Sequence, residues 1–441
     1  RSLMSAAKSH PPESHVVDIL GSTKGRDQPV MLVAKAVQLA GCLDEEVLTD
    51  PNTIFFDPFC KAGEILLATA LTACLAKSKR TTPLATFDEI ASELYSGRYF
   101  ALGPDERHYL LSKRTFYGNE RSHDTTIAKY IRNGNYVSEV DGRLDEEKFK
   151  EELKAMIEFI KKTNPNGKIV VVGNPPYQEA DGGAKASAKP VYNFFVEQLI
   201  DSGAVEELSV VIPARWFSGG KNLDSFREKI ANSGQVKTLQ YFERAEDVFP
   251  TVHVQGGVCF LNWKKSHKGE AEFIYKDSSY EIDLSKFDII PDDPDSTPII
   301  EKIMNSSIKE SVADYAWSRK PFGLPTNFFD DPSKEVSSET RGSIPCYVKG
   351  RKIKYMLASE IRQNSEHVNK WKVAIPRAYA TGARRCTLPK HQVFLIKKGE
   401  ITTETYNVIQ SFDSKAEAER LITYLQTDFA RYLLGLRKLT Q

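Results

Sequence analysis

Apolar and polar positions alternate along the first two-thirds of the chain in the patterns of short buried strands and longer amphipathic helices. Short apolar runs predict strands at 53–57, 115–120, 168–173, 208–212, 236–242 and 257–263. Between them, wider periodic stretches predict helices at 64–77, 146–162, 191–201 and 222–232. Strands that alternate with helices favour an α/β fold with a doubly wound, mostly parallel Rossmann-like sheet.

The regular alternation ends near Trp263, and the rest of the chain mixes short strands, loops and a predicted final helix at 414–436. Pro291-Asp292-Asp293-Pro294-Asp295 is a cluster of helix and strand breakers, typical of a linker. A chain of 441 residues is long enough for two domains. We therefore expect an α/β domain at 1–285 and a mixed α+β domain at 286–441.

Composition excludes several classes of protein. With 41% hydrophobic and 27% charged residues, the chain is neither disordered nor fibrous. Its longest apolar stretch, Ile65 to Ala76, is too short to span a bilayer, so no membrane is expected. The six cysteines and eight histidines include no C-x-x-C or H-E-x-x-H pattern, and we expect no metal. Scattered cysteines without a signal-peptide pattern predict a cytoplasmic protein.

The net charge of +1 hides a strong asymmetry. Residues 341–441 hold 19 basic and 8 acidic side chains, a balance of +11, whereas residues 266–340 hold 8 and 16. A concentrated basic segment is expected where a protein contacts nucleic acid, although a solvated basic face explains the charge equally well. The candidate DNA-binding residues are Lys349, Arg351, Lys352, Lys354, Arg384 and Arg385.

The sharpest motif is Gly173-Asn174-Pro175-Pro176-Tyr177, directly after the clearest buried strand. Two consecutive prolines fix φ and remove two backbone donors, so the free groups of the loop are acceptors. The Asn174 amide oxygen and the Pro175 carbonyl could accept hydrogen bonds from a planar amine, and Tyr177 offers an aromatic wall. A rigid turn that closes a strand is the alternative. Ligands bind at the carboxyl ends of strands in such sheets, which favours a functional role.

Two further segments have weaker signals. Asp57-Pro58-Phe59-Cys60-Lys61-Ala62-Gly63 is a strand followed by a tight turn and a helix, which brings backbone N–H groups close to a ligand. Glu120, in Tyr117-Gly118-Asn119-Glu120, would end the next predicted strand, where an acid can hold ribose hydroxyls. Leu102-Gly103-Pro104-Asp105 is the competing segment for that role.

Read in order, these motifs over residues 20–330 resemble the gamma-type N6-adenine DNA methyltransferases of type II restriction–modification systems. Asn174-Pro175-Pro176-Tyr177 is similar to the catalytic motif of that family. The segments 211–216, 247–250, 256–260 and 318–324 are similar to its later motifs. Lys61 and Ala62 depart from the usual glycine and serine, and the long spacing from Asp57 to Tyr117 predicts an insertion at about 80–110.

The resemblance implies S-adenosyl-L-methionine as cofactor and Asn174 to Tyr177 as catalytic residues. Tyr177 and Phe249 would stack on the target base. A base inside a duplex is out of reach, so it would be flipped into the pocket. Pro29 lies where the family closes over the methionine end of the cofactor, and Asn135 stands in for the acid that holds the cofactor adenine. The implied cofactor-binding residues are Pro29, Asp57, Pro58, Phe59, Cys60, Ala62, Gly63, Glu120, Asn135 and Asn174.

The sequence therefore predicts an adenine-specific DNA methyltransferase, with its target-recognition domain at 286–441. Double-stranded DNA is the expected substrate, a cognate restriction endonuclease the possible partner, and a monomer the expected state. One alternative is a protein-glutamine or ribosomal RNA methyltransferase with the same N-P-P-Y loop. Glutamine methyltransferases usually end soon after that loop, whereas this chain continues far beyond Tyr177. The other alternative is a non-catalytic DNA-binding regulator on this fold.

Overall fold

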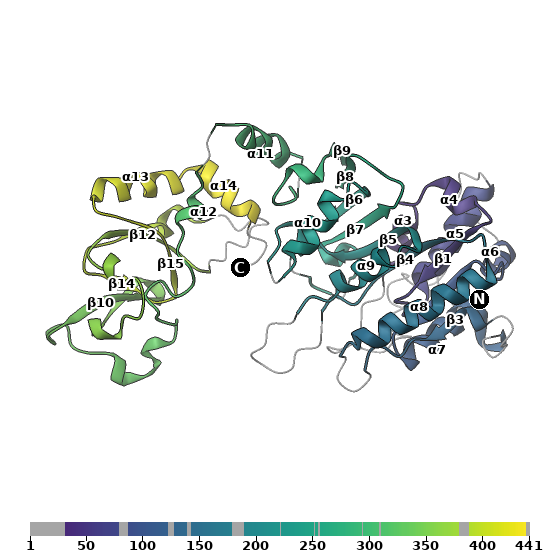
Figure 1. The fold of residues 1–441 in the computed structure, drawn as a ribbon, viewed down its shortest axis with the longest axis horizontal. Helices are drawn as coiled ribbons and strands as arrows, with labels where there is room; N and C mark the ends of the chain where they lie inside the picture. The colour runs from purple at the N-terminus through teal and green to yellow at the C-terminus, as the bar shows by residue number, and fades with distance from the viewer. Residues whose placement is uncertain are drawn as a thin grey trace. The chain divides into compact units, whose positions relative to one another are not determined.

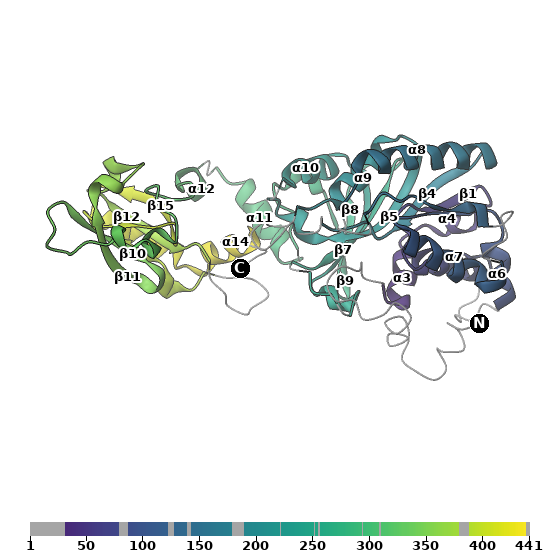
Figure 2. The ribbon, with the colours of Figure 1, turned by 90° about the horizontal axis from the view of Figure 1, so that it is seen from below.

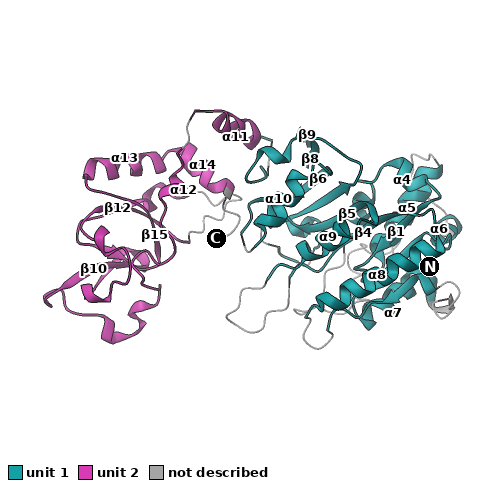
Figure 3. Ribbon diagram, in the orientation of Figure 1, with its two compact units in different colours: residues 1–294 teal, residues 295–441 magenta. Residues whose placement is uncertain are grey.

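The computed structural model shows a chain that divides into two compact units, residues 1–294 and 295–441 (Figure 3). It describes residues 31–78, 87–121, 128–138, 143–178, 189–220, 222–250, 252–254, 256–292, 294–307, 310–378 and 388–437. Residues 286–294 lie with the first unit, where the backbone N–H of Ile290 donates to the carbonyl of Phe217 at 2.8 Å. Over the described ranges, no helix combines the length and the apolar character that crossing a membrane requires.

A nine-stranded sheet forms the first unit, in the order β3-β2-β1-β4-β5-β7-β6-β8-β9. Strands β7 and β9 run antiparallel to their neighbours, and the other pairings are parallel. The predicted mostly parallel α/β sheet is confirmed. The strands are β1 (Thr53–Asp57), β2 (Tyr99–Gly103), β3 (Ile131–Asn133), β4 (Lys168–Gly173), β5 (Val205–Pro213), β6 (Val236–Phe242), β7 (Val258–Lys264), β8 (Ala271–Tyr275) and β9 (Ser278–Ile282).

Helices cover both faces of this sheet (Figures 1 and 2). One face carries α3 (Val33–Ala40), α5 (Glu64–Ser78), α6 (Phe87–Leu94) and α7 (Glu106–Arg121). The other carries α8 (Glu146–Thr163), α9 (Tyr192–Asp201) and α10 (Asp224–Asn232). The short helix α4 (Glu45–Thr49) packs on α5. Because both faces are covered, the central strands are buried, and every residue of β1 lies in the interior, including Thr53 and Asp57.

The strand order reverses direction at β1, which pairs with β2 on one side and with β4 on the other. Chain connections leave the sheet to opposite faces at such a point, and a crevice opens at the carboxyl ends of the strands. The turn after β1 and the Asn174 loop after β4 both begin there. The fold thus places the two strongest sequence motifs on neighbouring strands.

Three sequence predictions about the first unit are wrong. Residues 115–120 are not a strand but belong to α7, whose helical geometry is interrupted at Gly118 (φ 66°, ψ 177°). The strand beside β1 is β2, so residues 87–103 form part of the sheet and its helices rather than an insertion. Short apolar runs do not distinguish a buried strand from a buried helical segment, which explains the error. The sheet also continues beyond Trp263 with β8 and β9.

The second unit contains two three-stranded sheets, ordered β11-β10-β14 and β13-β12-β15. Its helices are α11 (Ser296–Met304), α12 (Val312–Tyr315), α13 (Lys415–Leu425) and α14 (Asp428–Arg437). The predicted single helix at 414–436 is therefore wrong, since α13 ends at Leu425 and α14 begins at Asp428. The strands are β10 (Ser343–Val348), β11 (Lys352–Leu357), β12 (Trp371–Pro376), β13 (Phe394–Ile396), β14 (Ile401–Thr402) and β15 (Tyr406–Phe412).

Candidate functional site

The Asn174 loop is buried at the end of β4. Asn174 is 1% exposed and both prolines are buried, whereas Tyr177 is partly exposed. The far side of the loop is fixed to the start of α9, where the N–H of Val191 donates to the carbonyl of Tyr177 at 3.2 Å. The proline-stiffened loop thus holds its acceptor groups in a fixed, dehydrated place, as a hydrogen-bonding catalyst requires.

Gly173 brings this loop into contact with the turn after β1. A Cβ atom on Gly173 would lie 2.8 Å from Oδ1 of Asp57 and 3.0 Å from the ring of Phe59. Such distances leave no room for a side chain, so glycine permits the close approach. The candidate catalytic loop and the candidate cofactor turn therefore meet directly. The sequence pattern indicated Gly173 only as the end of a strand, and its role follows from strand pairing alone.

The 57–63 turn is held rigidly by backbone hydrogen bonds. Oδ1 of Asp57 accepts from the N–H of Phe59 at 2.9 Å, and the N–H of Cys60 donates to the carbonyl of Leu102 at 3.0 Å. Gly63 has φ +83°, a conformation that favours glycine, and α5 begins at the next residue. Burial raises the pKa of Asp57 to about 8, against the opposing hydrogen bond from Phe59.

Lys61 is the unusual residue of this turn. Its side chain is buried, at 4% exposure. Burial lowers the pKa of Lys61 to about 8, although nearby Glu64 and Asp57 favour its charged form. A cation in this turn would oppose the binding of another cation, such as a sulfonium group. The resemblance places a glycine here, so the lysine is the clearest departure of the site.

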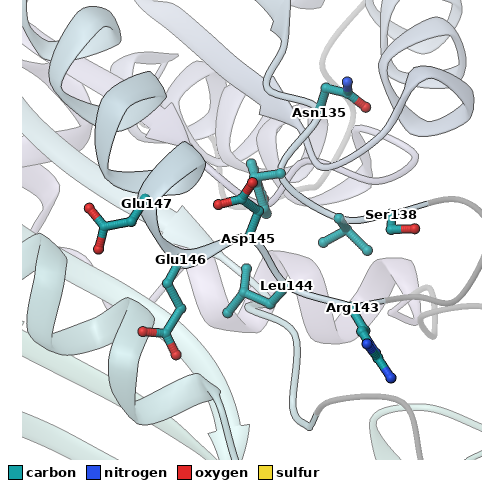
Figure 4. Close-up of a pocket in the computed structure, with 9 residues that line it drawn as sticks. Asn135, Ser138, Arg143, Leu144, Asp145, Glu146 and Glu147 are labelled. Carbon is teal, nitrogen blue, oxygen red and sulfur yellow. The ribbon is translucent and has the colours of Figure 1, made fainter. Parts of the chain in front are cut away.

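Asn135 and Tyr136 border the turn from the segment after β3. The hydroxyl of Tyr136, which is fully buried, donates to the carbonyl of Pro58 at 2.6 Å. Asn135 has φ 47° and lines a hollow of about 710 Å³ with residues 136–138 and 143–147. Arg143 lies on one side of this hollow and Glu146 and Glu147 on the other (Figure 4). The role of Asn135 towards the cofactor stays a prediction.

Tyr177 and Phe249 lie together, but not as two parallel walls. Their ring centroids are 6.2 Å apart and the planes are inclined by 76°, an edge-to-face contact. Phe249 has no exposed surface and belongs to the core. The Tyr177 hydroxyl is buried and has no hydrogen-bond partner among the described residues, and burial raises its pKa. Of the two rings, Tyr177 is the one a ligand can reach.

The acid that follows the strand beside β1 is not the one that the sequence predicted. Asp105, not Glu120, follows the strand beside β1. However, Asp105 accepts from the backbone N–H of His108 at 2.9 Å and from its ring Nδ1 at 2.7 Å. Burial raises the pKa of Asp105, but these hydrogen bonds outweigh it and hold the pKa below its usual range. Asp105 therefore caps α7 rather than offering free oxygens.

Glu120 loses its strand-end position, but its segment still lies near the 57–63 turn. A Cβ on Gly63 would be 3.1 Å from the ring of Phe116 and 3.4 Å from Thr115. Gly118, where the helical geometry breaks, comes two residues before Glu120. The side chain of Glu120 lies outside what the structure describes, so its role as a ribose ligand stays a prediction.

Replacing Glu120 and Asp105 separately by alanine distinguishes a role in cofactor binding from a role in capping α7. Glu120→Ala should weaken S-adenosylmethionine binding by about 1–3 kcal/mol, the cost of unpaired hydrogen-bonding groups. Asp105→Ala should instead lower the free energy of unfolding by about 0.5–2 kcal/mol, as loss of a helix cap does, and leave cofactor affinity unchanged. Calorimetric titration and thermal unfolding measure the two effects. The reverse pattern would assign the ribose to Asp105.

The predicted DNA-binding residues differ in their surroundings, and two of them lie outside the described residues. Lys349, Arg351 and Lys352 are exposed at the turn of the hairpin β10–β11. Arg351 also donates to the carbonyl of His391, and Lys354 forms an ion pair with Glu335 at 2.7 Å. Pro29, Arg384 and Arg385 lie outside the described residues, and so does the Lys24–Gln28 segment. Within the described ranges, no cluster of His, Cys, Asp and Glu could hold a metal ion.

A comparison with known protein families finds a match over part of the chain. Residues 98–249, from β2 to Phe249, match the Eco57I restriction-modification methylase family. This span contains the Asn174 loop but not the 57–63 turn. No curated protein matches the chain. The predicted resemblance to restriction–modification methyltransferases is thus confirmed at the level of a methylase family, for residues 98–249.

Solved structures with similar folds are distant in sequence. A nuclease-deletion mutant of the Type ISP restriction-modification enzyme LlaGI, in complex with a DNA substrate mimic, aligns with 99% of this chain and 49% of its own, at 9% identity and TM-score 0.51. The ATP-dependent Type ISP restriction-modification enzyme LlaBIII bound to DNA aligns with 90% of this chain and 35% of its own, at 11% identity and TM-score 0.49. The Type IIL enzyme MmeI in complex with DNA aligns over 91% and 62%, at 11% identity and TM-score 0.43. The chain therefore spans less than two-thirds of these relatives, and the LlaGI alignment indicates a shared fold.

Proposed function

We propose that this chain is a site-specific DNA methyltransferase of a restriction–modification system that transfers a methyl group from S-adenosylmethionine to the N6 amine of adenine. The observation that carries the proposal is the contact between the Asn174 loop and the 57–63 turn at the carboxyl ends of β4 and β1. The family match over residues 98–249 supports it. Duplex DNA is the proposed substrate, with a cognate endonuclease as possible partner.

Apart from Lys61, the chain's own residues fit the cofactor and the base. Asp57, Pro58, Phe59, Cys60, Ala62 and Gly63, in the turn that leads into α5, would hold S-adenosylmethionine. When bound, the cofactor supplies an electrophilic methyl group. Asn174 and Pro175 would accept hydrogen bonds from the adenine amine. Its lone pair is delocalised into the ring, and these bonds would favour the geometry in which it attacks. Positioning supplies much of the acceleration.

The test is methylation of a random duplex DNA library followed by sequencing of the modified adenines. The proposal expects modified adenines within one short sequence, and no modification by the Asn174→Ala variant. Modification of a cytosine, of RNA or of a glutamine side chain in place of adenine would contradict it. The last two results would instead support the ribosomal RNA or protein-glutamine alternative.

Lys61 favours a second candidate, a non-catalytic DNA-binding regulator on this fold. Its buried ammonium lies in the turn that would receive a cationic cofactor. Calorimetry separates the two candidates because the regulator should bind DNA without binding S-adenosylmethionine. If Lys61 merely weakens an active site, Lys61→Gly should tighten cofactor binding.

Alanine substitutions of Tyr177 and Phe249 should have different effects on the free energy of unfolding. Tyr177→Ala should cost about 1–3 kcal/mol in binding or transfer, the range of base–aromatic stacking. Phe249→Ala should in addition lower the free energy of unfolding by about 3–5 kcal/mol, because it leaves a cavity in the core. Fluorescence of 2-aminopurine at the target position should rise when the wild-type protein binds. An unchanged signal on the recognised site would argue against base flipping.

A further inference from the structure

A buried carboxylate joins two arginine side chains at the surface of the second unit. Glu404 is 4% exposed, and its Oε1 accepts from Nε of Arg319 at 2.6 Å and from Nη1 of Arg377 at 2.5 Å. The side chains of Arg319 and Arg377 are 71% and 41% exposed. Two guanidinium groups share one carboxylate, so the cluster keeps a net positive charge at the surface.

The loop that carries Arg319 is anchored on both sides. Before it, the N–H of Trp317 donates to the carbonyl of Val408 at 3.0 Å, and the Trp317 ring contacts those of Phe322 and His367. After it, Phe322 and Leu324 are buried in a core cluster of the second unit. Between these anchors, residues 318–320 are exposed. Arg319 therefore stands on a short loop with little freedom.

The backbone of this loop is also strained. Lys320 has φ +57°, in the left-handed region, which costs a residue other than glycine roughly 1–2 kcal/mol. Side-chain hydrogen bonds hold it there: Nε2 of Gln363 donates to the carbonyl of Lys320, and Nδ2 of Asn364 to that of Pro321 at 2.7 Å. Strain that the surroundings hold in place tends to mark functional sites.

The orientation of the Arg319 guanidinium suits recognition of the flat edge of a base. Nε of Arg319 is held by Glu404, and neither terminal nitrogen hydrogen-bonds to another residue that the structure describes, so both can reach an outside partner. That planar fork matches the O6 and N7 acceptors of guanine in the major groove. A contact with phosphate needs charge but no fixed orientation, so a flexible surface lysine would serve. Burying the Glu404 carboxylate costs desolvation free energy, so the ion pairs are weak evidence for a gain in stability. Their clearer effect is that they fix the orientation of the two arginine side chains.

We propose that Arg319 contacts a guanine edge in the DNA sequence this protein recognises, that Arg377 makes a neighbouring DNA contact, and that Glu404 positions both. The inference rests on the proposed DNA methyltransferase function and assigns part of the sequence recognition to the second unit. Neither arginine is among the six candidate DNA-binding residues of the sequence analysis, although Arg377 lies within the basic segment 341–441.

The test uses the full chain and a random duplex DNA library. Wild type, Arg319→Ala, Arg319→Lys and Arg420→Ala would each methylate the library, and the modified adenines would be sequenced. Both Arg319 variants should lose discrimination for guanine at one position of the site by about 5- to 150-fold, the range of a bidentate guanine contact. Arg420 is an exposed arginine of α13 in the same unit, and Arg420→Ala should keep the wild-type profile.

Glu404→Gln tests the positioning role. It retains the size of the side chain and both arginines, but removes the charge that fixes them. It should relax the same base pair as Arg319→Ala while the slope of log affinity against log salt stays at the wild-type value. A merely structural role would lower the unfolding temperature and leave the base preference unchanged. Arg319→Lys, which can keep the ion pair with Glu404, decides the case if Arg319→Ala does not fold.

The outcomes separate the role of Arg319 from the function on which it rests. If wild type modifies no adenine, the proposed function fails. If wild type recognises a site and both Arg319 variants keep the same preference at every position, only the role of Arg319 is overturned. Uniform weakening on all sequences, with a salt slope flatter by about 0.9, would identify Arg319 as a phosphate-binding residue and would also overturn the base contact.

Discussion

Replacing Asn174 by alanine should abolish methyl transfer to DNA while cofactor affinity changes by no more than a few-fold. Asn174 is almost fully buried at the end of β4, on a loop that two prolines stiffen. Loss of one preorganised hydrogen-bonding group of an active site typically reduces turnover by about 100- to 1,000-fold. Single-turnover methylation measures transfer, and calorimetry with S-adenosylmethionine measures binding.

Two further variants sharpen this result. Asn174→Asp keeps an acceptor oxygen in the same place and should retain more activity than Asn174→Ala. Asn232→Ala, at the exposed end of α10, removes an asparagine far from the loop in sequence and should behave as wild type. Near wild-type turnover by Asn174→Ala would remove the catalytic assignment. Loss of cofactor binding by this variant would instead assign Asn174 to the cofactor site.

Removing the second unit should abolish sequence-specific DNA binding. The basic balance of +11 lies entirely within residues 341–441, and the compact units divide at Pro294/Asp295. A fragment of residues 1–294 should still bind S-adenosylmethionine, which also shows that it is folded. Its affinity for the recognised site should fall to that for random DNA, a loss of about 1,000-fold or more. Competition binding between a duplex with the recognised site and a duplex of random sequence measures the ratio of the two affinities.

The salt dependence tests the same assignment in the full chain. Removal of one side chain that neutralises a phosphate should flatten the slope of log affinity against log salt by about 0.9. Lys349→Ala and Lys352→Ala, at the exposed turn of β10–β11, should each show this change, whereas Lys354→Ala should show less because Lys354 pairs with Glu335. If a fragment of residues 1–294 kept the full site preference, the first unit would be the part of the chain that recognises the DNA sequence.

The sequence alone determined the alternation of strands and helices from β4 to β7 and the stiff Asn174 loop after β4, whose catalytic role stays a prediction. The apolar run from Ile169 to Val172, directly before a turn with two prolines, favours a buried strand, and α8 shows a continuous buried stripe from Phe149 to Ile160. Two prolines after Asn174 stiffen the loop in any fold. These properties are local, so a single stretch of sequence is sufficient to predict them.

Only the tertiary structure decided which segments meet. The runs at 99–103 and 115–120 are both short and apolar, and only pairing with β1 selects the first as the strand. The contact of Gly173 with Asp57 depends on strand order, and burial of Lys61 depends on the elements packed around the turn. Arg319, Arg377 and Glu404 are separated by up to 85 residues, and no periodicity links them. Contacts between distant segments form because burial and hydrogen bonding favour them in the folded chain, and such pairings leave no local pattern.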